Sequence, residues 1–498
     1  KLQGSISQSL DSAANLIKQI CYPRHLTSMA PKRWKRSRNG ATGCPDAPAA
    51  GMPEALPEAL ELPSRSHAEQ LMQRLWTGEL AGEAPEVPTE GRTVQAEKPP
   101  LTEKGYPGHG RNGPRRGEAF FPVMSSQELA RLLVSVEDSK KIKAVFEEYG
   151  VCIVTNVLSA AECAAFEDLW HDDLLRLLDG SKVDAEVSKQ VEMVKQDLKA
   201  WPRQWDQHLG MKGMASKHGL PHGSFAWGTR MHPKVRQVFA DLYDTTQQEL
   251  VVGLDNVFWS SAQDEGTDSN PEWLHVDQNH RTGMTWPCAQ GVLYIWPTEG
   301  SSSSSTVVWP KSHKEVYEKM MDDPEAILRG RSAGGQSVKI KELQMACLRE
   351  ELMAEGLLNC RRVPCPAGSL LLWDSRTVHQ GWRGGPRLAQ PICWEPRERR
   401  SEEAFRRKLW MCTSGIPSSH SAAEGRVHGM AKEAPSPSLH GGLPLLRASL
   451  VPYGIRSGEE MTWLQQQEAI WPTDNPKRQA GIPASLLPML RAEMQQVL

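Results

Sequence analysis

The sequence has no apolar run that approaches 18 residues, and it has almost no net charge. A membrane-spanning helix needs roughly 20 consecutive apolar residues, so none is expected. With 58 Lys and Arg against 60 Asp and Glu, the formal charge is −2, and the whole chain is not drawn to nucleic acid or to an anionic membrane. Neither a transmembrane helix nor a nucleic-acid partner is therefore predicted.

The ten cysteines include no C-x-x-C pair, and several stand inside apolar runs. A disulfide framework or a zinc site would show paired, regular spacings. Cys360 and Cys365 are near each other but have no second pair to complete a zinc site. We therefore expect reduced thiols in an intracellular compartment, most simply the cytoplasm.

The first part of the chain is poor in Ile, Val and Phe. Residues 1–118 are rich in Pro, Gly, Ala, Glu and Arg, and such a segment buries too little apolar surface to offset its ordering entropy. We predict a disordered arm over 1–118, one globular domain over 119–425 and a partly helical extension over 426–498. The basic segment "MAPKRWKRSRNG" from Met29 fits a nuclear or organelle address, with a solvated charged tail as the alternative.

The globular part combines helices with many short strands. The capping boxes Ser125-x-x-Glu128 and Ser159-x-x-Glu162 predict the starts of two helices. Beyond residue 248, short runs rich in Val, Leu, Ile and Trp alternate with turn residues and predict strands. These runs are "ELVVGLDNVFW", "EWLHVD", "GVLYIWP", "STVVWP", "SLLLWD" and "QPICWEP". Helices do not alternate with them, so we expect a mainly β core of the sandwich or barrel class with flanking helices and a helical insertion at 313–356.

Four His-x-Asp/Glu triplets occur, about twice the number that composition alone gives. The triplet at His67 lies in the arm. The triplet at His171 lies in a predicted helix, where side chains two residues apart diverge. His275 and Asp277 instead lie in a predicted strand, where side chains at i and i+2 point to one face. One imidazole and one carboxylate on one face can supply two adjacent metal ligands.

A distant strand pair supplies a second histidine and an arginine. In "GSLLLWDSRTVHQGW", a turn after Asp374 leads to His379, which with His275 and Asp277 would complete a facial 2-His-1-carboxylate triad. Arg387 follows eight residues later, and its guanidinium can bind a carboxylate through two parallel hydrogen bonds. The ordered set predicts a metal centre beside an anchor for a dicarboxylate.

Over about residues 140–425, the sequence resembles the phytanoyl-CoA dioxygenase family of Fe(II)/2-oxoglutarate oxygenases. The resemblance rests on "FEEYGVCIVTNVLSAAE", "LHVDQN", "VLYIWPT", "STVVWPKSHKE" and "GSLLLWDSRTVHQGW" with Arg387. It implies a double-stranded β-helix (a jelly roll of the cupin type). It also implies Fe(II) bound by His275, Asp277 and His379.

By the same resemblance, Arg387 binds 2-oxoglutarate, Trp296 lies beside that cosubstrate, and His313 is structural. The implied activity is O2-dependent hydroxylation of a small-molecule or acyl substrate, with succinate and CO2 as coproducts and ascorbate as a candidate reductant. No oligomeric state is predicted.

Three positions depart from the family pattern. Arg383 competes with Arg387 as the anchor, Gly381 stands where a Ser often follows the distal histidine, and Lys311 stands where Gly is usual. Two other functions remain alternatives: a Jumonji-type protein hydroxylase or demethylase, which usually anchors its cosubstrate with Lys, and a non-catalytic binding barrel. His420 is interpreted as a loop histidine, with a lid or substrate contact as the alternative.

Overall fold

The computed structural model describes, within a compact unit spanning residues 61–498, the following residues: 70–71, 74–75, 77–80, 121–180, 209–211, 213–216, 219–260, 272–279, 286–298, 304–324, 326, 337–401, 403–404, 407–408, 411 and 417–424. In these residues, no helix combines the length and the apolar character that crossing a membrane requires. The predicted extension over 426–498 lies outside the described residues.

A six-stranded sheet forms the larger half of the β core. Its strand order is β1 (Leu133–Ser135), β2 (Val151–Thr155), β12 (Ser369–Asp374), β8 (Ala289–Tyr294), β14 (Arg387–Ile392) and β6 (Phe258–Ser260). Only the β1–β2 pair is parallel. Every residue of the central strands β2, β12, β8 and β14 is buried, so both faces of this sheet are covered.

A five-stranded antiparallel sheet forms the other half. Its order is β10 (Val338–Lys339), β7 (His275–Val276), β13 (His379–Trp382), β9 (Ser305–Val308) and β11 (Arg361–Val363). Two short antiparallel pairs complete the strands, namely β5 (Leu250–Val252) with β15 (Trp394–Pro396) and β3 (Gly210–Met211) with β4 (Met214–Ala215). Antiparallel sheets with flanking helices confirm the expected β core in outline.

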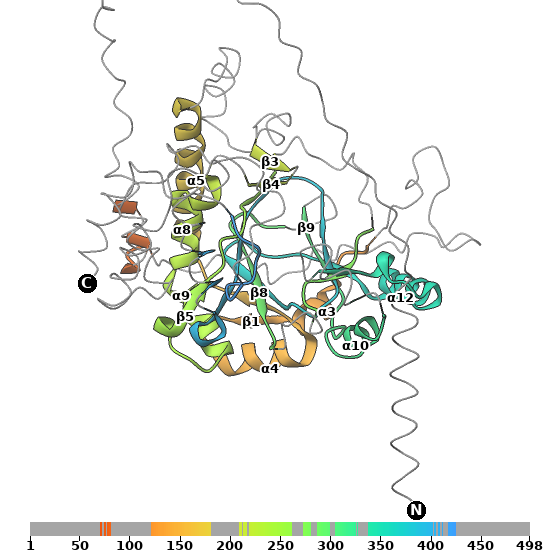
Figure 1. Cartoon of the computed structure of the whole chain (residues 1–498). Coiled ribbons are helices and arrows are strands. Elements are labelled where there is room, and N and C mark those ends of the chain that lie inside the picture. The colour runs from red at the N-terminus through yellow and green to blue at the C-terminus, as the bar shows by residue number, and fades with distance from the viewer. Residues whose placement is uncertain are drawn as a thin grey trace, which may run out of the picture. The chain divides into compact units, whose positions relative to one another are not determined.

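Helices cover the two sheets on different sides, as Figure 1 shows. On the side of the six-stranded sheet lie α4 (Ser139–Tyr149), α5 (Ala160–Gly180), α8 (Ser224–Met231) and α9 (Pro233–Leu242). On the side of the five-stranded sheet lie α10 (Glu315–Met321) and α12 (Ala346–Asn359), whose apolar side chains form a second core cluster with β7 and β9. The short α3 (Ser126–Ala130) precedes β1.

Both predicted capping boxes are present. The Ser125 hydroxyl accepts a hydrogen bond from the Glu128 amide (3.3 Å), and the Glu128 carboxylate accepts one from the Ser125 amide (2.8 Å). Ser159 and Glu162 repeat this exchange at the start of α5 (3.1 and 2.6 Å). Each box satisfies amides that the first helical turn leaves without partners, and so fixes where the helix begins.

Some expected element bounds differ from the structure. The run at 249–259 is divided into β5 and β6, because Gly253 packs against the backbone of residue 420: a Cβ there would lie 2.3 Å from the His420 carbonyl oxygen. The insertion at 313–356 is not purely helical, since β10 joins the five-stranded sheet beside β7.

A short stretch inside the expected disordered arm packs on the core. Residues 70–71, 74–75 and 77 are helical, and Leu71 and Leu75 are buried in the same cluster as the six-stranded sheet. The Ser159 hydroxyl also donates to the Leu80 carbonyl oxygen (2.9 Å). Two leucines one helical turn apart thus supply an apolar face within the segment predicted as a disordered arm.

Candidate metal centre

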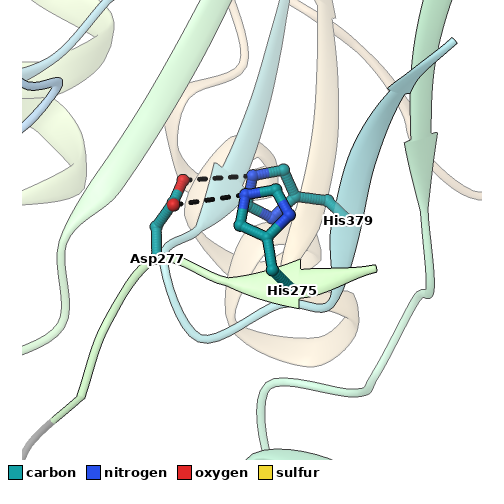
Figure 2. Close-up of side chains that lie close together, drawn as sticks. All are labelled: His275, Asp277 and His379. Atoms are coloured by element: carbon teal, nitrogen blue, oxygen red, sulfur yellow. Dashed lines mark ion pairs between the residues drawn. The ribbon is translucent and has the colours of Figure 1, made fainter. Parts of the chain in front are cut away.

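His275, Asp277 and His379 converge at the junction of two neighbouring strands. His275 on β7 and His379 on β13 are register partners, and Asp277 follows β7 two residues after His275. The His275 Nε2 lies 3.3 Å from Asp277 Oδ1, and the His379 Nε2 lies 3.1 Å from Asp277 Oδ2. Figure 2 shows both imidazole edges directed at the one carboxylate. One ligand atom from each of these side chains lies within 4.8 Å of the other two, a spacing that one ion can bridge.

Backbone contacts set the tautomer of both imidazoles. The Nδ1 of His275 lies 3.2 Å from the Trp273 carbonyl oxygen, and the Nδ1 of His379 lies 2.9 Å from that of Thr377. A carbonyl oxygen only accepts hydrogen bonds, so in the neutral rings Nδ1 carries the hydrogen and Nε2 keeps its lone pair. Metal-binding histidines commonly have this arrangement.

The carboxylate is oriented in the same way. The Gln290 side-chain amide, on β8, donates to Asp277 Oδ2 (3.2 Å), and the Asp277 backbone amide donates to the Ser375 carbonyl oxygen (2.9 Å). Gln290 is buried, at 3% exposure, so this hydrogen bond forms away from bulk water. The donor fixes the carboxylate while leaving lone pairs free for a cation.

Burial and neighbouring charge set the ionisation of the site. Burial would raise the pKa of Asp277, but the imidazoles of His420, His275 and His379 together hold it well below its usual range. Burial and the neighbouring His379 lower the pKa of His275. An ionised carboxylate beside a neutral imidazole is the protonation state that metal binding requires.

Aromatic side chains surround the two imidazoles. The Trp273 ring stacks on that of His275, with centroids 4.8 Å apart and planes 14° apart, and the Trp373 ring lies 5.2 Å from that of His379. A Cβ at Gly381 would lie 3.5 Å from Trp273 Cζ2, an ordinary van der Waals contact, so the tryptophan does not by itself require a glycine at the position where a Ser often follows the distal histidine.

Arg387 is buried on the facing sheet without a carboxylate partner. Its side chain extends from β14 over the Phe258 ring (4.3 Å to the centroid), and its Nη2 donates to the Tyr294 hydroxyl (3.2 Å). Its Nε has no hydrogen-bond partner in the described part of the chain. Burial raises the pKa of Tyr294 to about 12, so the phenol stays neutral. A buried guanidinium with an orphaned N–H fits a bound carboxylate.

The structure separates the two candidate anchors by burial. Arg387 is 7% exposed, whereas Arg383 is an exposed residue in the loop before β14. A charge at the surface is screened by water and binds a carboxylate weakly, while a buried one binds it strongly. These positions favour Arg387.

Trp296 and His313 have other neighbours. The Trp296 indole donates to Glu167 on α5 (2.8 Å), which directs this ring toward the helical layer. A contact of Trp296 with a cosubstrate stays a prediction. The His313 Nε2 lies 3.2 Å from the Glu147 carbonyl oxygen, and a Cβ at Gly150 would lie 2.3 Å from its ring. His313 thus fills the space at the end of α4, in keeping with a structural role.

Tyr294 bridges the two sheets beside the arginine. Its hydroxyl, on β8, lies 2.9 Å from the Thr306 hydroxyl on β9, so the inner faces of the two sheets meet here. Gln290 and Tyr294 were not predicted as site residues, although their spacing of four along one strand places them on one face. His420, interpreted from the sequence as a loop histidine with a lid or substrate contact as the alternative, has its Nε2 3.9 Å from Asp277 Oδ2.

A second group of possible ligand atoms lies near β8. Cys288 Sγ and Cys393 Sγ are 3.6 Å apart, with the Glu395 carboxylate close by. The Glu395 oxygens already accept hydrogen bonds from Trp286, Ser421 and the Ala423 amide. The hydrogen bond and burial beside Cys393 raise the pKa of the Cys288 thiol well above its usual range. This group is therefore better explained as part of the core.

Comparisons with known proteins place the site in a family. Residues 146–384 match the phytanoyl-CoA dioxygenase (PhyH) family. The Ava biosynthesis cluster protein O of Aspergillus versicolor is 24% identical over 251 residues, which cover 47% of this chain and 77% of that protein.

Two solved structures were compared as well. The epimerase SnoN, in complex with Fe3+, α-ketoglutarate and nogalamycin RO, has 13% identity and a TM-score of 0.32, covering 52% of this chain and 84% of its own. HygX from Streptomyces hygroscopicus, with nickel and 2-oxoglutarate bound, has 16% identity and a TM-score of 0.30, covering 51% and 85%. Residues 146–384, which hold His275, Asp277 and His379, match the phytanoyl-CoA dioxygenase (PhyH) family, and this part of the chain is a member of that Fe/2-oxoglutarate-dependent oxygenase family.

Proposed function

We propose that His275, Asp277 and His379 bind Fe(II), and that Arg387 binds the distal carboxylate of 2-oxoglutarate. The observation that carries this proposal is the pair of Nε2 atoms and one carboxylate directed at a common point, within 4.8 Å of one another. Two imidazoles and one carboxylate on one side of an ion leave positions for a cosubstrate and O2. The bound metal would supply oxidative decarboxylation of 2-oxoglutarate to succinate and CO2, coupled to hydroxylation of a substrate.

The fold supports this assignment of roles. We infer that the six-stranded and five-stranded sheets form the double-stranded β-helix of the family, since Tyr294 and Thr306 join their inner faces. The ligands come from the five-stranded sheet and Arg387 from the six-stranded one. A dicarboxylate bound between the sheets could therefore reach both the metal and the guanidinium.

In this proposal, Arg387 binds 2-oxoglutarate through a buried ion pair. Among the described residues, the neighbours of this charge are the Phe258 and Tyr294 rings and the Tyr294 hydroxyl. A carboxylate would satisfy the orphaned Nε and compensate the buried charge. Tyr294, which stays a neutral phenol, can orient the same ligand.

The substrate is proposed to be a small molecule or an acyl compound, as the family name implies. Trp273, partly exposed beside His275, offers an apolar surface at the site. Ascorbate is kept as an auxiliary reductant for the assay, although no described contact argues for an ascorbate site. A Jumonji-type protein hydroxylase is less well supported, because Arg387 stands in place of a lysine anchor. The complete ligand set argues against a non-catalytic barrel.

An anaerobic titration tests the proposal directly. Fe(II) and then 2-oxoglutarate are added to the full chain, and the charge-transfer absorption of the 2-oxoglutarate complex is followed. We expect saturable binding of one metal and one cosubstrate, and succinate release after O2 is admitted. A protein that binds neither Fe(II) nor Mn(II) would refute the assignment. A protein that binds both ligands but never forms succinate would instead favour the binding barrel.

A further inference from the structure

A third histidine stands at the entrance of the proposed metal site. The His420 Nε2 lies 3.9 Å from Asp277 Oδ2. Its side chain is 29% exposed, whereas the side chains of His275, Asp277 and His379 are at most 10% exposed. His420 is therefore more exposed than the three proposed ligands, and it lies beside the Oδ2 oxygen of the Asp277 carboxylate.

His420 is placed outside the ligand set. The ligand atoms of His275, Asp277 and His379 lie within 4.8 Å of one another, and His420 is not part of that group. The neighbour of His420 is Asp277 Oδ2, which also accepts a hydrogen bond from the Gln290 side-chain amide (3.2 Å). The Gln290 amide donates to this oxygen, and the His420 imidazole lies beside it at a distance longer than a hydrogen bond, so both are placed to orient the carboxylate that the metal would bind.

Buried polar contacts hold the 417–424 segment that carries His420. Ser418 exchanges two hydrogen bonds with Leu254: its amide donates to the Leu254 carbonyl oxygen, and its hydroxyl accepts from the Leu254 amide, each at 2.9 Å. The fully buried ammonium of Lys408 donates to the Ser418 hydroxyl (3.0 Å) and the Ser421 carbonyl oxygen (2.7 Å). Burying Lys408 is costly unless its charge is satisfied, so this segment has a defined position.

Further contacts hold the segment at His420 and at the residues that follow it. The buried Glu395 accepts hydrogen bonds from the Ser421 hydroxyl (2.9 Å) and the Ala423 amide (2.8 Å). Gly253 allows the close approach of the His420 backbone, because a Cβ there would lie 2.3 Å from the His420 carbonyl oxygen. The imidazole is thus directed at Asp277 by a rigid support, although it lies 36 residues (420 − 384) beyond the end of the family match.

We propose that His420 is a positioning residue that, with Gln290, orients Asp277 for metal binding. This inference rests on the proposed metal site. Substituting an outer partner of a metal ligand generally costs 10–100-fold in metal affinity. Loss of the His420 imidazole removes a neighbour of Asp277 Oδ2 and leaves the Gln290 hydrogen bond in place.

Mn(II) binding, followed by electron paramagnetic resonance, tests this without a substrate or turnover. We expect His420→Ala to weaken Mn(II) binding by about tenfold or more and to alter the spectrum of the bound ion. His420→Gln, whose amide can donate toward the same oxygen, should restore most of the affinity and the spectrum. The matched control is Ser419→Ala, because the Ser419 hydroxyl has no hydrogen-bond partner in the described residues. That variant should bind Mn(II) like the unaltered protein.

A second variant separates the role of the segment from that of the ring. Gly253→Ala displaces the backbone under His420 and should weaken Mn(II) binding in the same direction. Should His420→Ala not fold, as judged by thermal unfolding, His420→Leu keeps the volume, lacks a donor and carries the same expectation. Unchanged Mn(II) affinity in a folded His420→Ala or His420→Leu variant overturns the inference. Failure of the unaltered chain to bind Mn(II) overturns the proposed function instead.

Discussion

His275 and His379 face each other across neighbouring antiparallel strands, with ring centroids 4.3 Å apart and planes tilted by 45°. Cross-strand partners have Cβ atoms about 4.5–5.5 Å apart, so two histidines 104 positions apart (379 − 275) in the chain become neighbours at the proposed metal site. A shift of one residue in the β7–β13 register would direct one imidazole to the opposite face. The site therefore depends on the register of the five-stranded sheet as much as on the side chains themselves.

Replacing His379 should abolish metal binding while the domain stays folded. His379→Ala removes one of three proposed ligands, so Mn(II) or Fe(II) affinity and 2-oxoglutarate turnover should be lost. Circular dichroism should remain unchanged. The contrasting variant is His313→Ala, which removes a buried ring packed on Gly150 and should lower the melting temperature without changing metal affinity. Full turnover by His379→Ala would show that the ligand assignment is wrong.

Arg387 should control the affinity for 2-oxoglutarate and leave that for metal almost unchanged. Removing one partner of a buried charge pair costs about 3–5 kcal/mol, which corresponds to about a hundredfold or more in affinity. Arg387→Ala should therefore weaken 2-oxoglutarate binding by at least that factor in the metal-loaded protein. Arg383→Ala is the control, because Arg383 is exposed. If Arg383→Ala gives the larger loss, the anchor is misassigned.

The unliganded protein offers an independent test of Arg387. A buried charge without a carboxylate partner destabilises the fold, and an apolar side chain of similar length removes that cost. Arg387→Met should thus raise the melting temperature in the absence of 2-oxoglutarate. It should also abolish the stabilisation that 2-oxoglutarate gives to the metal-loaded protein. A lower melting temperature for the unliganded variant would indicate that the guanidinium is already compensated.

The convergence of the ligands could be predicted because it follows from local rules. The period of two in a strand places His275 and Asp277 on one face, and an apolar run with a turn placed His379 at the start of another strand. Arg387 could be separated from Arg383 only in the folded structure, where one is buried and the other exposed. Sequence spacing alone carries no information on that difference.

His420 and the 70–80 stretch show what the sequence does not convey. The segment that carries His420 is held through contacts with Gly253, Leu254 and Lys408, and no local sequence pattern marks those partners. Leu75 stands in a segment of polar and Pro-rich composition, which predicts disorder on average. Apart from Leu71, the other buried members of its cluster come from Met124 onward in the chain. The average composition of residues 1–118 does not reveal that Leu71 and Leu75 are buried in the core.

The 70–80 stretch should contribute to stability and not to metal binding. Leu75 is 1% exposed, and truncating a buried leucine costs about 2–5 kcal/mol. Leu75→Ala should lower the free energy of unfolding by that amount, whereas Leu358→Ala, at 71% exposure, should change it little. A chain beginning at residue 119 should melt at a lower temperature but bind Mn(II) with unchanged affinity. Equal unfolding curves for Leu75→Ala and Leu358→Ala would rule out a packing role.

The presence of Asp277 predicts hydroxylation and not halogenation. Related enzymes that transfer halide have a small residue at this position, which leaves a coordination site for chloride, whereas the Asp277 carboxylate occupies it. Once a substrate is known, mass spectrometry of products made under labelled O2 in chloride buffer provides the measurement. One labelled oxygen should enter the product and one should enter succinate. The matched variant is Asp277→Gly, in which the position is open and halide can compete. A chlorinated product from the unaltered protein would contradict the role assigned to Asp277, because the carboxylate would then not be occupying the site.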